Sequence, residues 1–151
     1  MSEATARSRK GLGSAAAIFA GQGDVLLVRH TYGRTNWELP GGIAESNESP
    51  MQTAIREVRE ETGLDVVATC LTGYYYEPAE DLVHFVFLCE RRGVDTHPVP
   101  NCAEISECGW WPLDDLPRPI SDFTVRRIRD AVDGARLPLL GTVGSRLWIG
   151  P

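Results

Sequence analysis

Residues 42–64 read GIAESNESPMQTAIREVREETGL and carry the clearest local signals in the chain. Ser49 can cap a helix, Pro50 suits its first turn, and Gln52 completes the pattern of a capping box. Gly63 can adopt the left-handed conformation that closes a helix. The sequence therefore predicts a helix from about residue 50 to Gly63, which is an ordinary helix length.

The predicted helix has one apolar side and one acidic side. The spacing i, i+4, i+7 and i+11 predicts a buried stripe, formed by Met51, Ile55, Val58 and Thr62. Glu57, Glu60 and Glu61 lie on the opposite side, within an arc of about 100°. Carboxylates this close raise one another's pKa unless a cation lies among them. With no convergent His or Cys, the oxygen ligands favour Mg²⁺ or Mn²⁺ over zinc, and a simply solvated acidic surface is the alternative.

The whole stretch resembles the Nudix box, the signature G-x5-E-x7-R-E-U-x-E-E-x-G-U of the Nudix hydrolase family, where U is a bulky aliphatic residue. Every fixed position is filled, by Gly42, Glu48, Arg56, Glu57, Val58, Glu60, Glu61, Gly63 and Leu64. The preceding Trp37–Gly42 segment is similar to the family's usual lead-in. Asn47 departs from the glycine that is common in relatives, but Asn tolerates positive φ, so we expect the loop to be preserved. The resemblance implies an α/β fold, an α/β/α sandwich with a mixed β-sheet.

The resemblance also implies a metal site. A diphosphate is inert because its negative oxygens repel hydroxide, so a catalyst must neutralise charge, position a water and accept its proton. Mg²⁺ or Mn²⁺ would be held by Glu57, Glu60 and Glu61, with Glu48 as a further ligand, directly or through water. Arg56 would orient a neighbouring carboxylate, with an ordinary surface charge as the alternative.

Two further parts of the catalytic site are predicted. Gly41 and Gly42 would let the backbone approach a metal-bound phosphate without interference from side chains. The general base in this family varies in position, so two candidates stay open here. Glu57 lies within the box and is preferred as a base or metal ligand, whereas Glu104 lies beyond it and is equally well explained as an exposed strand residue.

The predicted reaction is hydrolysis of a nucleoside diphosphate linked to a group X, such as ADP-ribose or a nucleotide sugar, to a nucleoside monophosphate and phosphoryl-X. A (d)NTP pyrophosphatase and a non-catalytic nucleotide-sensing domain are the alternatives. Pro78 lies 15 residues after Gly63, a spacing that resembles ADP-ribose-cleaving relatives but also suits an ordinary turn. Trp37 and the tyrosines at 74–76 are candidates for stacking on a base.

Length and charge limit the remaining options. The 151 residues are 42% hydrophobic, enough for one buried core, so we expect a single Nudix domain over residues 13–151 after a flexible tail of residues 1–12. The net charge of −6 argues against a nucleic-acid partner, because phosphate backbones require basic surfaces. No run approaches the ~18 apolar residues of a membrane span. We therefore expect a cytoplasmic protein that binds a small nucleotide, and a homodimer is among the oligomeric states left open.

The cysteines and one histidine have structural explanations. No CxxC pair or matched histidine accompanies the cysteines, which indicates free thiols at Cys70, Cys89, Cys102 and Cys108. His84 lies inside a predicted strand, where a satisfied structural histidine is favoured over a catalytic one.

Further elements flank the predicted helix. Apolar runs at 15–20 and 25–28, separated by a turn, predict a β-hairpin, and more strands are expected at 37–39, 65–76, 82–91 and 103–111. Ser121 or Asp122 can cap a second helix that ends at Gly134. Its predicted apolar side is formed by Phe123, Val125, Ile128 and Val132. Residues 135–151 support no assignment.

Overall fold

The computed structural model describes residues 7–93, 96–133 and 139–150. Its elements follow the order β1 (Gly11–Ile18), β2 (Val25–His30), β3 (Trp37–Glu38), β4 (Gly41–Ile43), α1 (Pro50–Thr62), β5 (Val66–Glu77), β6 (Leu82–Arg91), β7 (Ile105–Trp111), β8 (Ile120–Ser121), α2 (Asp122–Val132), β9 (Leu139–Thr142) and β10 (Trp148–Ile149). Neither of these helices is long and apolar enough to cross a membrane.

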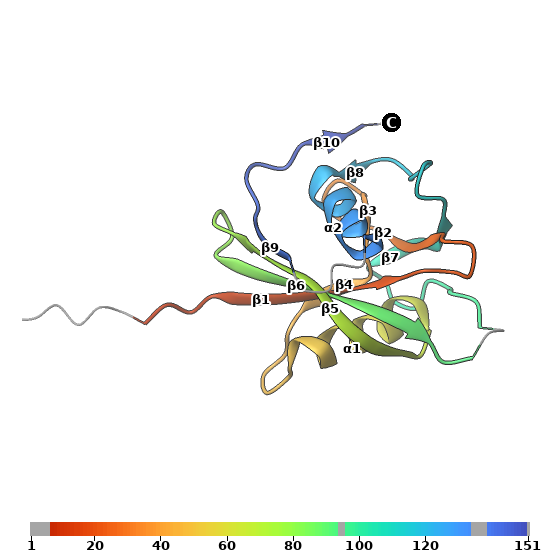
Figure 1. The fold of residues 1–151 in the computed structure, drawn as a ribbon, viewed down its shortest axis with the longest axis horizontal. Coiled ribbons are helices and arrows are strands. Elements are labelled where there is room, and N and C mark those ends of the chain that lie inside the picture. Colours follow the sequence, from red (N-terminus) through yellow and green to blue (C-terminus); the bar gives the residue numbers. More distant parts are fainter. Residues whose placement is uncertain (1–6, 94–95, 134–138, 151) are drawn as a thin grey trace, which may run out of the picture.

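The strands form two five-stranded sheets (Figure 1). The first has the order β4-β1-β6-β5-β9 and the second the order β10-β8-β3-β2-β7. In the first sheet β1 runs parallel to β6 and antiparallel to β4, so the mixed sheet predicted from the sequence is confirmed. The parallel register pairs Gly13 with His84 and Ala15 with Val86. The four residues of these two pairs therefore lie next to one another on the same face of the sheet.

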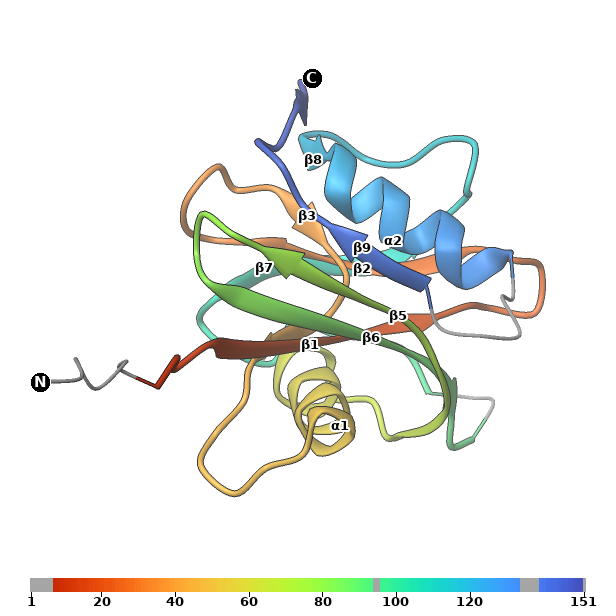
Figure 2. The ribbon, with the colours of Figure 1, turned by 60° about the vertical axis from the view of Figure 1, so that its left-hand side comes forward.

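The two helices cover opposite faces of the first sheet (Figures 1 and 2). Because side chains alternate along a strand, β1 contributes to both cores. Ala16 and Ile18 belong to the core cluster that contains Val58 of α1. Ala15 and Ala17 belong to the cluster that contains Ile128 of α2, and this second cluster also includes Trp37 and Leu39 around β3. The arrangement confirms the predicted α/β/α sandwich.

The ends of α1 agree with the sequence prediction. Ser49 accepts a hydrogen bond from the backbone N–H of Gln52, and the Gln52 side chain accepts one from the N–H of Ser49. Gly63 closes the helix with φ of 75°. Asn47 adopts φ of 63° in the preceding loop, the conformation for which Asn is a tolerated substitute for Gly.

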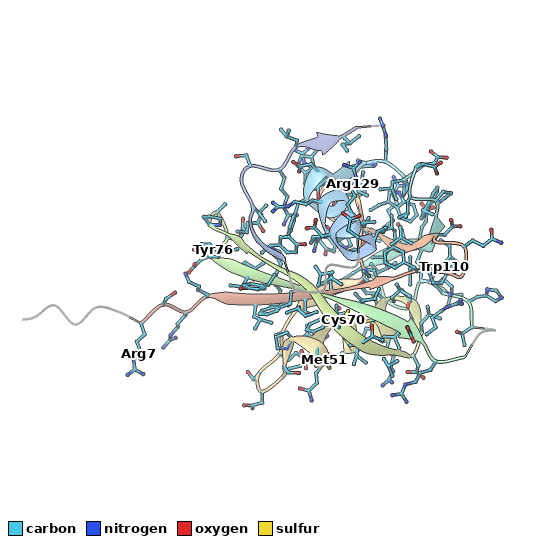
Figure 3. The ribbon with its side chains drawn as sticks, viewed as in Figure 1. Arg7, Met51, Cys70, Tyr76, Trp110 and Arg129 are labelled. Atoms are coloured by element: carbon cyan, nitrogen blue, oxygen red, sulfur yellow. The ribbon has the colours of Figure 1, made fainter. Side chains whose placement is uncertain are left out.

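The buried face of α1 differs from the predicted stripe. Met51 is 44% exposed, and Figure 3 shows it on the outer side of the helix. Ile55 is only half-buried. The buried positions are Thr53, Ala54, Val58, Glu61 and Thr62. Strand β4 packs beside the helix on the side that carries Glu61, so this residue is buried although the periodicity assigned it to the acidic side.

The first two strands correct two further expectations. Strand β1 begins at Gly11, two residues inside the range predicted as a flexible tail. The predicted hairpin is wrong, because β1 and β2 belong to different sheets, and the β-pairing between them in the described residues is limited to an isolated bridge between Phe19 and Val25. Each strand finds longer partners elsewhere, β1 with β6 and β2 with β7.

Helix α2 begins after Ser121, whose hydroxyl accepts from the N–H of Thr124. Its buried positions are Phe123, Thr124, Arg127, Ile128 and Ala131, whereas Val132 is 46% exposed and Val125 is half-buried. The predicted apolar side is therefore correct at Phe123 and Ile128, and Val125 packs against the same core, whereas Val132 is wrong. The predicted stop at Gly134 lies outside the described residues. Two strands, β9 and β10, occupy the part of residues 135–151 that the structure describes.

Candidate active site

The site is organised around the glycine edge strand β4, which lies between β1 and α1. A Cβ at Gly41 would lie 2.5 Å from the carbonyl oxygen of Ser14, and a Cβ at Gly42 would collide with the carboxylate of Glu57. Only glycine therefore lets this strand fit between its two neighbours. The consequence is that the Glu57 carboxylate lies directly against the β4 backbone.

Glu57 and Glu61 form a buried acidic pair beside this strand. Glu61 is 5% exposed, and its Oε2 has no hydrogen-bond partner among the described residues. Burial, followed by the negative charge of Glu57, raises the pKa of Glu61 to about 9, although a hydrogen bond from the Gly41 backbone lowers it. Burial also raises the pKa of Glu57, against the lowering effect of Arg56. Without a cation the pair therefore holds a proton near neutral pH.

Arg56 contacts three carboxylates of the Nudix box. Its guanidinium contacts Glu48 at 2.7 Å, Glu57 at 2.8 Å and Glu60 at 3.0 Å. The bond from Arg56 is the main reason why the pKa of Glu48 falls to about 2, with help from the Glu45 backbone and Thr53. The predicted orienting role of Arg56 matches this geometry, since one planar donor group fixes three carboxylates.

The oxygen donors of this patch fit a hard divalent cation at the Glu57–Glu61 pair. Two buried carboxyl groups that repel each other, one with an unpartnered oxygen, are a place where a cation would relieve an electrostatic cost. In the described part of the chain, however, no three such side chains are already arranged to hold a metal. Glu48 and Glu60 are turned toward Arg56 instead. Their predicted roles as metal ligands stay predictions.

A cleft of about 210 Å³ opens on the other side of β4. Its lining comes from both sheets and from α2, and comprises Gly13, Ser14, Ala15, His30, Tyr32, Glu38, Leu39, Gly41, Gly42, Ile43, His84, Arg127 and Arg146. Gly41 and Gly42 are thus shared between the cleft and the acidic pair, as their predicted role beside a bound phosphate requires. The β4 backbone therefore has the cleft on one side and Glu57 on the other.

Two arginines in the cleft are each matched by a carboxylate. Arg127 is 4% exposed and contacts Glu38 at 2.5 Å, while Arg146 binds both oxygens of Glu77 at 2.9 and 3.1 Å. His84 contacts the same Glu77 at 2.7 Å. These pairs satisfy the buried charges, as buried ions require. The predicted structural explanation of His84 is consistent with this bond, but the residue also lines the cleft.

The mouth of the cleft carries an aromatic pair. The rings of His30 and Tyr32 are stacked with centroids 4.7 Å apart, and Tyr32 is 54% exposed. Burial of its hydroxyl raises the pKa of Tyr32, and further contributions come from the charges of Glu104, Glu61, Glu38 and Glu57. The tyrosine therefore lies within electrostatic reach of the cleft, the acidic pair and the predicted alternative base.

The sequence predicted a strand at Glu104, but the residue lies in the turn before β7. It is exposed, and its carbonyl oxygen accepts a hydrogen bond from the N–H of Thr31. This bond holds the turn close to the loop that carries Tyr32. Its role as a general base stays a prediction, because the structure brings it near the mouth of the cleft without placing it against Glu57.

The aromatic residues proposed to stack on a base are not in the cleft. Trp37 is 4% exposed and Tyr75 is fully buried, so neither is available for stacking. Tyr74 stacks on Phe85, and none of the four lines the cleft. Pro78 starts the turn after β5. The four cysteines are free thiols, as predicted.

Several cleft residues were not singled out from the sequence. The sequence could have identified Arg127 as a buried residue. It lies four residues from both Phe123 and Ala131, on the same side of α2. A cation inside an apolar helix stripe indicates a buried partner. Tyr32 and Arg146 lie in segments without periodicity, and no local signal marks them.

A mixed sheet lies between two helices, clustered glutamates lie at the edge of a cleft that contains arginines, and for a chain with this arrangement the comparisons with known proteins indicate a pyrophosphohydrolase. A family model described as "NUDIX domain" matches residues 9–131. The chain therefore belongs to the NUDIX family, and the resemblance seen in the box is confirmed.

Relatives and solved structures agree with this assignment. A MutT-like protein of Streptomyces ambofaciens is 32% identical over 133 residues, which cover 88% of this chain and 84% of the relative. An ADP-ribose pyrophosphatase of Bacillus subtilis is 39% identical over 79 residues, 48% of this chain and 42% of the relative. The structure of an ADP-ribose pyrophosphatase from Streptococcus suis superimposes with a TM-score of 0.73 at 27% identity, covering 87% of this chain and 99% of that one.

Proposed function

We propose that the protein hydrolyses the pyrophosphate bond of a nucleoside diphosphate linked to a group X, giving a nucleoside monophosphate and phosphoryl-X, with Mg²⁺ or Mn²⁺ as cofactor. The observation that carries the proposal is the Glu57–Glu61 pair, which lies against the glycine strand that borders the cleft. The similarity to ADP-ribose pyrophosphatases supports ADP-ribose as the first substrate to test.

Different residues of the chain have different roles in the proposed reaction. Glu57 and Glu61 would hold the cation, and Glu48 and Glu60 supply further oxygen ligands in the same patch. A cation bound there would supply positive charge near the diphosphate and make water a better nucleophile. Arg56 orients Glu57 through the contact at 2.8 Å. Gly41 and Gly42 leave room for the diphosphate beside the β4 backbone.

Glu57 is our preferred proton acceptor or metal ligand, and Glu104 is the second candidate for the base. Glu57 is largely buried, with a side chain only 14% exposed, and is fixed by Arg56, so its position is defined. Glu104 is exposed in a turn near Tyr32. We therefore expect Glu57→Gln to lower kcat far more than Glu104→Gln does. A larger loss in Glu104→Gln would assign the base to the turn before β7.

The test is a substrate panel with the purified full chain in the presence of Mg²⁺ and of Mn²⁺. ADP-ribose should yield AMP and ribose 5-phosphate, which ion-exchange chromatography separates. The MutT-like relative favours a second candidate, a (d)NTP pyrophosphatase, and that activity would instead release pyrophosphate from a triphosphate. Tight binding of ADP-ribose with no turnover would indicate a sensor. Failure to cleave any diphosphate-linked substrate would overturn the proposal.

A further inference from the structure

The floor of the cleft contains a gap in front of His84. Gly13 and His84 are partners in the parallel register of β1 and β6, and both line the cleft. A Cβ at Gly13 would lie 3.5 Å from Nδ1 of His84, at ordinary van der Waals distance. Because glycine has no Cβ, this nitrogen is reached from the space above Gly13. Any other residue at position 13 would place its Cβ in contact with this nitrogen.

The hydrogen bonds on the far side of the ring define which nitrogen carries the proton. Nε2 of His84 lies 2.7 Å from Oε2 of Glu77, and Arg146 donates to both oxygens of that carboxylate. Burial opposes ionisation of Glu77, but the bonds from His84 and Arg146 lower its pKa. An ionised carboxylate can only accept, so Nε2 must be the donor. Nδ1 is then an unprotonated acceptor as long as the ring is neutral.

The ring is neutral at physiological pH. Burial lowers the pKa of His84, and the nearby guanidinium groups of Arg127 and Arg146 act in the same direction, against the opposing effect of Glu77. Among the described residues no hydrogen bond reaches Nδ1, because the neighbouring guanidinium groups donate elsewhere, Arg127 to Glu38 and Arg146 to Glu77. The nitrogen is thus an acceptor that the protein itself leaves without a donor.

The charges of the cleft indicate what kind of group would supply that donor. Arg127 is neutralised by Glu38 and Arg146 by Glu77, so the wall around His84 carries no surplus positive charge. A second phosphate would meet carboxylates as well as guanidinium groups there. A neutral group with N–H or O–H bonds suits the position better, because it can donate to Nδ1 and leave both ion pairs intact.

We propose that Nδ1 of His84 is a specificity-determining acceptor, reached through the gap at Gly13, for an N–H or O–H donor on the neutral group that a nucleoside diphosphate-linked substrate places in the cleft. The inference rests on the proposed function, since it assigns one contact of that substrate. The donor is either the nucleobase or the group X, and both sources share the same chemistry.

Two variants remove the acceptor in independent ways. His84→Gln places an amide nitrogen where Nε2 was, so the bond to Glu77 is retained and Nδ1 is lost. Gly13→Ala leaves His84 unchanged and covers Nδ1 with a methyl group. The backbone at Gly13 does not have positive φ, so alanine fits without strain. Matched controls are His97→Gln in an exposed loop and Gly21→Ala, whose added Cβ meets nothing within 4 Å.

Binding is measured by calorimetry in EDTA and turnover in Mg²⁺, with three ligands. ADP-ribose is the reference, 1,N6-etheno-ADP-ribose lacks the N–H donors of the adenine amino group, and adenosine 5′-methyl diphosphate lacks the hydroxyls of X. The wild-type chain should bind one of the two analogues about tenfold more weakly than ADP-ribose, which identifies the donor, because an unpaired buried acceptor costs about 1–3 kcal/mol.

His84→Gln and Gly13→Ala should each bind ADP-ribose about tenfold more weakly than the wild type does. They should also bind ADP-ribose no better than the analogue that the wild type binds weakly. The loss should lie in KM, with kcat little changed, and both controls should retain the wild-type ratio. Variants that discriminate as the wild type does would overturn the inference and leave the proposed function standing. So would a wild type that treats all three ligands alike. A wild type that neither binds nor cleaves any of them would overturn the proposed function itself.

Discussion

Glu61 is a carboxyl group in a position where a negative charge is costly. Its side chain is buried, its Oε2 has no partner in the described part of the chain, and Glu57 lies beside it. Burial first, and the charge of Glu57 second, raise its pKa from 4.5 to about 9. The folded protein without metal therefore keeps Glu61 protonated at neutral pH, whereas the unfolded chain ionises it.

This difference predicts how the stability of the metal-free protein depends on pH. Because the folded pKa is raised, the contribution of Glu61 is fully present below pH 4.5 and is lost as pH rises toward about 9. Glu61→Gln mimics the protonated form and should be more stable than the wild type at pH 7 in EDTA, by about 1 kcal/mol or more. Urea unfolding of both proteins between pH 5 and 8 measures the difference, and a gap that stays constant with pH would contradict the shifted pKa.

The same substitution should have the opposite effect on activity. Glu61→Gln keeps the shape of the side chain but removes the charge that would hold a cation, so we expect kcat to fall by at least about a hundredfold. Mg²⁺ should raise the melting temperature of the wild type and not that of the variant. Glu90→Gln, at an exposed position of β6, is the control. An unchanged turnover rate would remove Glu61 from the site.

The free thiols should differ in reactivity. Burial raises the pKa of Cys89 to about 12 and that of Cys108 to about 11, so little thiolate forms at either near neutral pH. Cys70 is exposed on β5 (Figure 3). We expect an aromatic disulfide reagent at pH 7.5 to modify Cys70 first, with that fast phase absent in Cys70→Ser. A fast phase that persists in the variant would contradict the expectation that Cys70, the exposed thiol, reacts before the buried Cys89 and the partly exposed Cys102 and Cys108.

At the scale of elements, the features that could be predicted are those set within one helical turn. Ser49, Gln52 and Gly63 act on backbone groups a few residues away, so the ends of α1 follow from the sequence. The face that α1 buries also depends on β4, so Met51 and Glu61 were placed wrongly, whereas Val58 and Thr62 are buried as predicted. The predicted hairpin failed for a similar reason, because pairing with distant strands outweighs the short turn between β1 and β2.

The cap of α1 gives a prediction at this scale. Ser49→Ala removes the acceptor for the Gln52 N–H and half of the reciprocal pair, and should lower the free energy of unfolding by about 1 kcal/mol. Because the helix carries Glu57 and Glu61, urea unfolding is the primary measurement and turnover the second. Ser46→Ala, in the exposed loop before the helix, should change stability by less than about 0.5 kcal/mol. Equal losses in the two variants would mean that the cap does not stabilise α1.

At the scale of the molecule, the acidic patch and the cleft differ in how far they could be predicted. The patch is continuous in sequence, so the box residues and their shared face were accessible from spacing alone. The cleft joins β1, β3, β6, α2 and the segment before β10. Its ion pairs link positions as distant as Glu38 and Arg127, and no periodicity records such contacts. The cleft is therefore the part of the candidate site that only the fold brings together.

The Glu38–Arg127 pair connects the second sheet to α2 and should hold the cleft together. Arg127→Met would leave Glu38 beside Thr124 without its cation, and removal of one partner from a buried pair costs about 3–5 kcal/mol. Glu38→Gln combined with Arg127→Met removes both charges and should recover much of that loss. Arg129→Met, at an exposed position of the same helix, should cost less than about 0.5 kcal/mol.

Urea unfolding of the four proteins separates the charge from the packing. If the double variant is as unstable as Arg127→Met, the long side chain of Arg127 matters for its contacts with Phe123 and the core rather than for its charge. If the double variant recovers the lost stability, the pair contributes by neutralising two buried charges rather than by packing. The cleft would then keep its shape with neutral residues at positions 38 and 127.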